Sequence, residues 1–403
     1  MNHDPRPQLL RAAVIMSLRP GEAPLNDGGL LITSNPAERR ILAVGRYREL
    51  RHEGDFQEID LGPVTVAPGL INAHTHLEIS HLQGRTSGGR GFVAWLKSLV
   101  PHLNEPPTTT ALRQALDELR DCGTVFTADM ADRHAARLTA FLDEQAFPHW
   151  LMVQHFGFTT ASAQIPLPPT AAEISHPELA QRADFCRAGH AFYSTRASTL
   201  QAAFKWCQKE YKPFALHLAE SPAELEMLDR GRGEMADFFR ETGILPPDFK
   251  PPGLSPISYA ERLGLLSRHT LAIHCVHPVS DDIETLARRR VNVCLCPRSN
   301  AFIGVGRAPW EQFAAAGINL CLGSDSLTSN HDLNLWHELE FLCAFSPGTL
   351  DLESGLALLT RNAARALNLN RDYGSLEAGK IARWSIVPGN ILNLFRRPVN
   401  IFP

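Results

Sequence analysis

Short apolar segments alternate with stretches of helical periodicity through most of this chain. Eight segments between Val64 and Asp325 are apolar and rich in strand-favouring residues, and most are separated by stretches in which apolar residues recur every three or four positions. Residues 111–123 and 221–243 carry clear helix signals, since both end at a glycine and the second opens with Ser-Pro. The eight apolar segments are 64–74, 124–130, 149–156, 190–194, 213–218, 270–275, 291–296 and 318–325.

Eight alternations of strand and helix predict an α/β protein whose main domain, residues 64–373, is a (β/α)8 TIM barrel. A barrel of this kind carries its chemistry at the carboxyl ends of its strands. A doubly wound open sheet is the alternative, because periodicity does not reveal whether a sheet closes on itself.

The two ends of the chain have a different texture. Residues 9–18, 28–34 and 39–45 are short strand-like runs joined by loops rich in glycine and proline, and residues 374–390 alternate strand and turn signals after a helix-like stretch at 356–369. We therefore expect residues 1–63 and 374–403 to form one small β-sandwich domain beside the barrel.

Composition and charge exclude several classes of protein. With 403 residues, 44% hydrophobic, the chain can bury a large core. The 39 basic and 43 acidic residues leave a formal net charge of −4, which argues against partners such as nucleic acid or an anionic membrane. No apolar run approaches the roughly 20 residues that span a bilayer, and the first residues carry no signal-peptide core. Eight scattered cysteines without a C-x-x-C pair fit a cytoplasmic protein.

Polar side chains of the kinds that bind metals stand at the ends of predicted strands. His74 and His76 are two residues apart and would face the same side of the first strand, a spacing that suits metal ligands, although two loop histidines would look the same. His217 ends the fifth strand, and Glu220 follows where a carboxylate could shuttle protons or merely cap a helix.

Two further strands repeat this pattern. His274 lies at the end of the sixth strand, and Asp325 ends the otherwise apolar eighth strand, where it would either cap the next helix or point into the site. Polar groups at the ends of the first, fifth, sixth and eighth strands would converge on one barrel mouth.

Eight motifs in order resemble the metal-dependent hydrolases of the amidohydrolase superfamily. Within it, the chain is most similar to the branch of S-adenosylhomocysteine/methylthioadenosine deaminases and aminodeoxyfutalosine deaminases, which also includes guanine deaminase and the triazine chlorohydrolases. The motifs are APGLINAHTH at 67–76, GTVFTADM at 123–130, HAFYS at 190–194, HLAES at 217–221, AIHCVH at 272–277, CPRSNA at 296–301, LGSDSLTSN at 322–330 and GSLEAGK at 374–380.

The resemblance implies a role for each strand-end residue. It implies that one divalent metal ion, zinc as first expectation and iron as alternative, is bound by four ligands, His74, His76, His217 and Asp325. It makes Glu220 the proton shuttle, has Asp325 accept the proton of the attacking water, and places His274 within hydrogen-bonding reach of that water or the substrate.

The resemblance also implies a substrate class. We expect hydrolytic deamination of an amino-substituted purine or nucleoside-like heterocycle, with aminodeoxyfutalosine or an adenosyl thioether as leading candidates. His190 and Trp95 would contact this substrate, and Arg85 and Arg90 would either bind a substrate carboxylate or lie solvated on a Gly-rich loop. A chlorohydrolase or cyclic-amide hydrolase, and a non-catalytic binding or scaffold protein, are the alternatives. A homodimer is expected from the resemblance alone.

Overall fold

The computed structural model describes residues 6–35, 39–52, 54–158, 167–279, 281–346 and 348–396. The outermost residues of the predicted terminal domain, 1–5 and 397–403, therefore lie outside the described residues. Within the part of the chain that the structure describes, no helix is both long and apolar enough to cross a membrane.

Eight parallel strands form the centre of the molecule, in two four-stranded sheets whose strands follow chain order. Most of their residues are buried on both faces, which is why these segments read as apolar runs rather than as alternating ones. The first sheet consists of β6 (Leu70–Thr75), β7 (Thr124–Ala131), β8 (His149–His155) and β9 (Phe185–Gly189). The second consists of β10 (Phe214–Leu218), β11 (Thr270–His274), β12 (Asn292–Leu295) and β13 (Asn319–Leu322).

Helices connect and follow these strands. Their bounds are η1 (Leu77–Leu82), α2 (Phe92–Leu99), η2 (Val100–His102), α3 (Thr109–Asp121), α4 (Ala135–Glu144), α5 (Ala171–Ser175), η3 (Pro177–Gln181), α6 (Ala197–Lys209), α7 (Pro222–Arg230), α8 (Glu234–Glu241), α9 (Pro256–Arg262), α10 (Asp282–Arg289), α11 (Pro297–Ile303), α12 (Trp310–Ala315), α13 (Leu335–Ala344), α14 (Leu352–Leu359) and α15 (Arg361–Ala366). The α/β content predicted from the sequence is thus observed.

Hydrogen bonds link the two parallel sheets at the carboxyl ends of their strands. The N–H of Asp325 donates to the carbonyl oxygen of His74 at 3.0 Å, and the N–H of His217 donates to that of His190 at the same distance. Asn72 and Ser324 add two more bonds across the first of these seams, at 2.8 and 3.1 Å.

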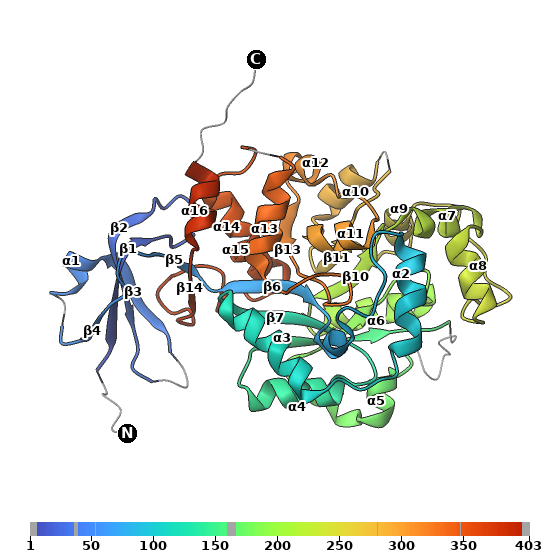
Figure 1. The fold of residues 1–403 in the computed structure, drawn as a ribbon, viewed down its shortest axis with the longest axis horizontal. Coiled ribbons are helices and arrows are strands. Elements are labelled where there is room, and N and C mark those ends of the chain that lie inside the picture. The colour runs from blue at the N-terminus through green and yellow to red at the C-terminus, as the bar shows by residue number, and fades with distance from the viewer. Residues whose placement is uncertain are drawn as a thin grey trace, which may run out of the picture.

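A third sheet contains strands from both ends of the chain. Figure 1 shows it at one end of the long axis, with α7 and α8 at the other. The order is β14-β5-β1-β2-β3, with β4 also pairing with β1. Its strands are β1 (Gln8–Ile15), β2 (Leu25–Ile32), β3 (Ile41–Arg46), β4 (Gln57–Asp60), β5 (Thr65–Pro68) and β14 (Trp384–Ile386), with the short helix α1 (Tyr47–Leu50) after β3 and α16 (Gly389–Arg396) after β14.

The fourth parallel strand lies earlier than the sequence predicts. The prediction placed it at 190–194, whereas β9 is Phe185–Gly189 and the predicted residues follow the strand. The apolar pattern of β9 is interrupted by Arg187, whose guanidinium is 2.8 Å from the carboxylate of Glu173 in a largely buried ion pair. Because the charge is paired, it can lie within a strand that looks too polar in the sequence.

Three further predicted elements are divided. The first apolar segment, 64–74, supplies β5 to the terminal sheet and β6 to the parallel sheet. The helix predicted at 221–243 is α7 and α8, separated where Gly231 adopts a left-handed φ of 65° that ends α7. The stretch 356–369 falls mainly in α14 and α15, which meet at the non-helical Thr360.

Candidate active site

The strand ends bring together three imidazoles and a carboxylate. The Nε2 atoms of His74 and His76 lie 3.2 Å apart, and Asp325 Oδ1 lies 3.4 Å from the first and 3.5 Å from the second. One nitrogen of His217 lies within 4.8 Å of the other two histidines. The two sheets thus each contribute to one cluster, with β6 supplying His74 and the second sheet supplying His217 and Asp325.

The carboxylate of Asp325 is held by hydroxyl groups on its far side. Ser299 Oγ donates to Oδ2 at 2.6 Å, and Ser329 Oγ donates to the same oxygen at 3.0 Å. Oδ1 is thereby left to face the histidines. Gly323 permits this arrangement, because a Cβ there would lie 2.7 Å from the Cβ of His74.

Hydrogen bonds orient the imidazole of His217 and that of the neighbouring His274. Nδ1 of His217 lies 3.0 Å from the carbonyl oxygen of His190, and Nδ1 of His274 lies 3.0 Å from the side-chain oxygen of Asn300. Because both acceptors are carbonyl oxygens, each Nδ1 carries the proton, and each Nε2 is left with a lone pair for the site.

Backbone strain is concentrated at these positions. Ala219, His274 and Asp325 have left-handed φ angles of 51°, 70° and 59°. Each costs roughly 1–2 kcal/mol for a residue with a Cβ. The strain turns the chain sharply at the strand ends, where the site residues stand, as is common at functional sites.

The protonation states suit a divalent cation. Burial lowers the pKa of His76 to about 3 and that of His274 to about 4, and it holds the pKa of His217 well below the usual value, so the imidazoles are neutral. Burial opposes the ionisation of Asp325, but contact with His74 outweighs it and holds the carboxyl pKa well below its usual value. Neutral imidazoles and an ionised carboxylate are the forms that bind metal.

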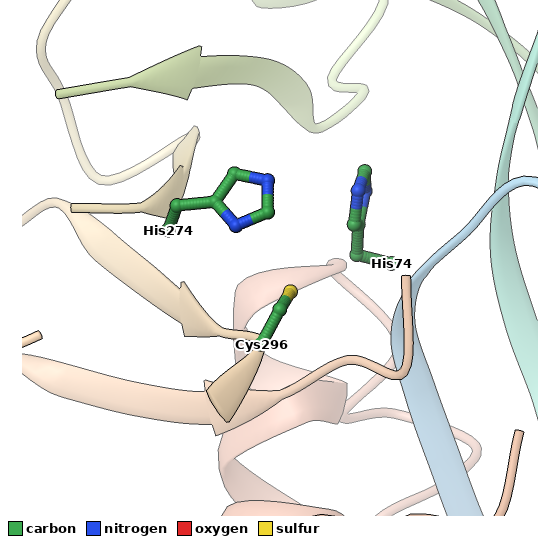
Figure 2. Close-up of side chains that lie close together, drawn as sticks. All are labelled: His74, His274 and Cys296. Carbon is green, nitrogen blue, oxygen red and sulfur yellow. The ribbon is translucent and has the colours of Figure 1, made fainter. Parts of the chain in front are cut away.

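A thiol lies close to this cluster. His74, His274 and Cys296 each place one potential ligand atom within 4.8 Å of the others, and Figure 2 shows the two rings and the thiol approaching from separate strand ends. Burial raises the pKa of the Cys296 thiol to about 12. Since the thiolate is the ligand form, the imidazole–carboxylate set suits a cation better, and Cys296 packs in the apolar core.

Glu220 lies beside the cluster, in surroundings that favour its protonated form. Its Oε1 is 3.4 Å from Nε2 of His274, and burial, reinforced by the charges of Asp325 and Glu224, raises its pKa well above the usual value. A buried carboxylic acid at this place can deliver a proton to a bound substrate.

Glu224 is a supporting residue that the sequence analysis did not identify. Its two carboxylate oxygens accept the backbone N–H groups of Ala219 at 3.3 Å and Glu220 at 2.7 Å, which fixes the strained turn. The Ser221-x-x-Glu224 spacing of a capping box was the available signal. Here Ser221 does accept the N–H of Glu224, while the glutamate reaches past the cap to the turn.

Asp129 plays a similar part at the end of β6. Its Oδ2 accepts the hydroxyl of Thr75 at 2.6 Å and the N–H of Leu77 at 3.1 Å, so it fixes the chain on either side of His76. Burial raises the pKa of Asp129 to about 7.

A cavity of about 560 Å³ opens over the cluster. Its inner end is lined by His76, His217, Glu220, His274 and Asp325. The predicted contact residues His190 and Trp95 also line it: the ring of His190 packs against Phe156 at 4.3 Å, and the indole N–H of Trp95 donates to the carbonyl of Thr328 at 2.9 Å. Tyr193, which packs edge-on to His190, is a further lining residue that the sequence analysis missed.

The two predicted arginine contacts are not brought into this cavity. Neither Arg85 nor Arg90 belongs to its lining among the described residues. The guanidinium of Arg85 binds Glu105 at 2.6 Å and approaches Nδ1 of His102 at 2.8 Å on the surface, and Arg90 is exposed. Local ion pairing therefore directs Arg85 away from the cavity.

Comparison with known proteins places this geometry in context. The model of the amidohydrolase family matches residues 65–397. The 5-methylthioadenosine/S-adenosylhomocysteine deaminase of Moorella thermoacetica is 29% identical over 341 residues, covering 80% of this chain and 73% of that protein. The aminodeoxyfutalosine deaminase of Deinococcus radiodurans is 26% identical over 340 residues, covering 80% and 77%. A zinc-bound adenosine deaminase structure from Xanthomonas campestris has a similar fold, with a TM-score of 0.79 at 22% identity, covering 100% of this chain and 88% of that one.

Proposed function

Because this chain belongs to the amidohydrolase family, we propose that it is a metal-dependent aminohydrolase that removes the amino group of a nucleoside-like purine as ammonia. The predicted resemblance is confirmed by the family match, and the prediction of a hydrolase acting on C–N bonds other than peptide bonds is confirmed by the same match and by the deaminase relatives. The observation that carries the proposal is the convergence of the imidazole–carboxylate cluster and Glu220, 3.4 Å from His274, in the lining of one cavity.

The proposed metal ligands are His74, His76, His217 and Asp325, whose donor atoms converge and whose protonation states suit a cation. A divalent ion bound there would supply the Lewis acidity that makes water a nucleophile near neutral pH. Zinc is the proposed ion, as in the Xanthomonas structure, with iron as the alternative.

The proton transfers can be assigned to the side chains of the cluster. Glu220 donates its proton to the ring nitrogen next to the amino-bearing carbon, which makes that carbon electrophilic. Asp325 accepts a proton from the attacking water, and Nε2 of His274, with its lone pair free, receives a hydrogen bond from that water. Asp325 passes its proton to the amino group, which leaves as ammonia, and the proton of the added hydroxyl group restores Glu220, so that one water is consumed for each amine released.

The proposal also includes the closure of the barrel and the terminal domain. We infer that the two parallel sheets are one (β/α)8 barrel, residues 64–373, an inference supported by the hydrogen bonds at both seams and by the similar fold of the Xanthomonas protein. A small β-sandwich domain drawn from residues 1–63 and 374–403 is supported by one sheet in which β14 pairs with β5 and β5 pairs with β1, so that β5 adds residues 65–68 to it. A cytoplasmic homodimer completes the proposal.

A substrate panel tests the proposed function. Protein loaded with zinc or iron is incubated with aminodeoxyfutalosine, methylthioadenosine, S-adenosylhomocysteine, guanine and a chlorinated triazine, and ammonia and chloride are both measured. We expect ammonia from at least one adenosine-type compound. Chloride release alone would favour the chlorohydrolase alternative, and a metal-loaded protein that releases neither product would contradict the proposal.

A further inference from the structure

The cavity has a second group of polar lining residues besides the metal-type cluster. The lining holds the histidines, Glu220 and Asp325, together with aromatic rings, among them Phe92, Trp95 and Phe156. It also holds Asn104, Asp132 and Arg133, and this group is called the outer end because Asn104 and Arg133 are exposed, whereas the histidines of the cluster are largely buried. Among the described residues that line the cavity, Arg133 is the one lysine or arginine.

The guanidinium of Arg133 is fixed by its neighbours on two sides. Its Nε lies 3.3 Å from Oδ2 of Asp132, and its Nη1 donates to the side-chain oxygen of Asn104. Among the described residues Nη2 has no hydrogen-bond partner, so this nitrogen can donate to a ligand. The side chain is 44% exposed, as a group at a cavity mouth would be.

The turn that carries Arg133 is also anchored. Glu78, which is 5% exposed, accepts the backbone N–H of Asp132 at 2.5 Å and that of His134 at 2.9 Å. Both N–H groups flank Arg133, so the base of its side chain is held against the segment that follows His76. An arginine fixed in this way loses less conformational entropy when it binds a ligand.

We propose that this outer end is an anion subsite, in which Arg133 binds a carboxylate on the part of the substrate farthest from the reacting amine. The inference rests on the proposed function and narrows it to nucleoside-like amines with an anionic appendage. The aromatic residues of the lining would pack against the rings of such a compound. Planar guanidinium and carboxylate groups form charge-assisted hydrogen bonds that an uncharged appendage cannot replace.

The selectivity between an anionic and an uncharged substrate tests the subsite. The ratio of kcat/KM for aminodeoxyfutalosine to that for methylthioadenosine is measured in the wild type, in Arg133→Gln and in Arg133→Lys. We expect the ratio to fall about tenfold in Arg133→Gln, because KM for the anionic compound rises. This is the low end of the effect of a hydrogen bond to a charged group, since the site is partly exposed. Arg133→Lys should recover part of the loss, since it restores the charge without the planar group.

The matched control is Arg137→Gln, the same change at an exposed residue of α4 outside the cavity lining, which should leave the ratio unchanged. Raising the salt concentration should reduce the wild-type ratio and leave that of Arg133→Gln nearly constant. An Arg133→Gln ratio equal to that of the wild type would overturn the anion subsite.

A binding measurement separates failure of the subsite from failure of the proposed function. Aminodeoxyfutalosine binding to Glu220→Gln protein, with and without Arg133→Gln, is measured by calorimetry, which needs no turnover. If the wild type releases no ammonia but Arg133→Gln weakens binding about tenfold, the proposed function fails and the subsite stands. If ammonia is released and binding is equal in both variants, the subsite fails alone.

Discussion

The inner and outer ends of the cavity differ in how their side chains are held. At the inner end, His74, His217 and His274 are buried, and backbone groups or buried side chains fix the turns that carry them. At the outer end, the buried Glu78 holds the turn that carries Arg133, but the side chains of Arg133 and Asn104 are exposed and hydrogen-bond each other. The difference teaches that strand topology places the reacting groups, whereas packing of surface loops decides which groups meet the remainder of a substrate.

Removing an inner ligand should have the largest effect. Asp325→Asn removes the one anionic member of the proposed ligand set while keeping the size of the side chain, so we expect metal content to fall to near background and activity with it. Substitution of a residue that only supports a metal ligand reduces metal affinity or activity by roughly 10–100-fold. The loss of metal affinity in Asp325→Asn should be larger than this. Metal analysis of purified protein checks this, with Asp229→Asn, an exposed residue of α7, as control. Full metal content in Asp325→Asn would refute its role as a ligand.

Glu220→Gln should separate proton transfer from metal binding. The amide cannot donate a carboxylic proton, so kcat should fall by about 100-fold or more while metal content stays near that of the wild type. Rate measurements and metal analysis on the same sample decide the matter. Metal loss would make Glu220 a structural support, and undiminished activity would remove it from the mechanism.

Asp129, which holds the chain beside His76, should make the free energy of unfolding depend on pH. The folded-state pKa of Asp129 is raised by burial to about 7, so its contribution to stability is complete below its unfolded pKa near 4 and is lost as pH rises to 7. Between pH 5 and pH 8 this should cost the wild type about 2 kcal/mol that Asp129→Asn does not lose.

Melting temperatures of both proteins at the two pH values measure this difference. Because the variant keeps the same histidines, their titration cancels, and Asp129→Asn should gain a few degrees on the wild type between pH 5 and pH 8. A constant difference would show that Asp129 ionises as easily in the folded protein as in the unfolded chain.

The smallest effect is expected at Arg85. Its guanidinium is paired with Glu105 on the surface, outside the cavity lining, so Arg85→Ala should change kcat/KM by less than about twofold for anionic and neutral substrates alike. A loss of kcat/KM for the anionic substrate alone would show that Arg85 contributes to the outer end of the cavity.

The sequence predicted the inner end well for a physical reason. A parallel strand presents its carboxyl end to one edge of the sheet, so His74, His217, His274 and Asp325 could be assigned to one place from strand order alone. Glu224 was missed because its function, holding the turn at Ala219 and Glu220, depends on where a side chain reaches, and the capping-box spacing suggests only a helix start.

The outer end and parts of the fold could not be predicted in this way. Arg85 follows η1 and Arg133 follows β7, and contacts with Glu105 and His102 hold the first on the surface, outside the cavity lining. Strand β9 was predicted too late in the chain because its charged residue, Arg187, has a buried partner that the sequence does not reveal. The left-handed conformation of Gly231 divides a continuous helical pattern into two helices. Each case depends on a contact with a distant residue or on one backbone angle.

The hydrogen bonds between Asn72 and Ser324 join positions 252 residues apart in the sequence. Contacts of such long range close a large loop of chain, so they form only after much of the intervening chain has become ordered. The ligand cluster shares this seam, with His74 and Asp325 on its two sides. A nascent or truncated chain that ends before β13 therefore has no assembled site, and acquisition of metal would report that synthesis and folding of the parallel strands are complete.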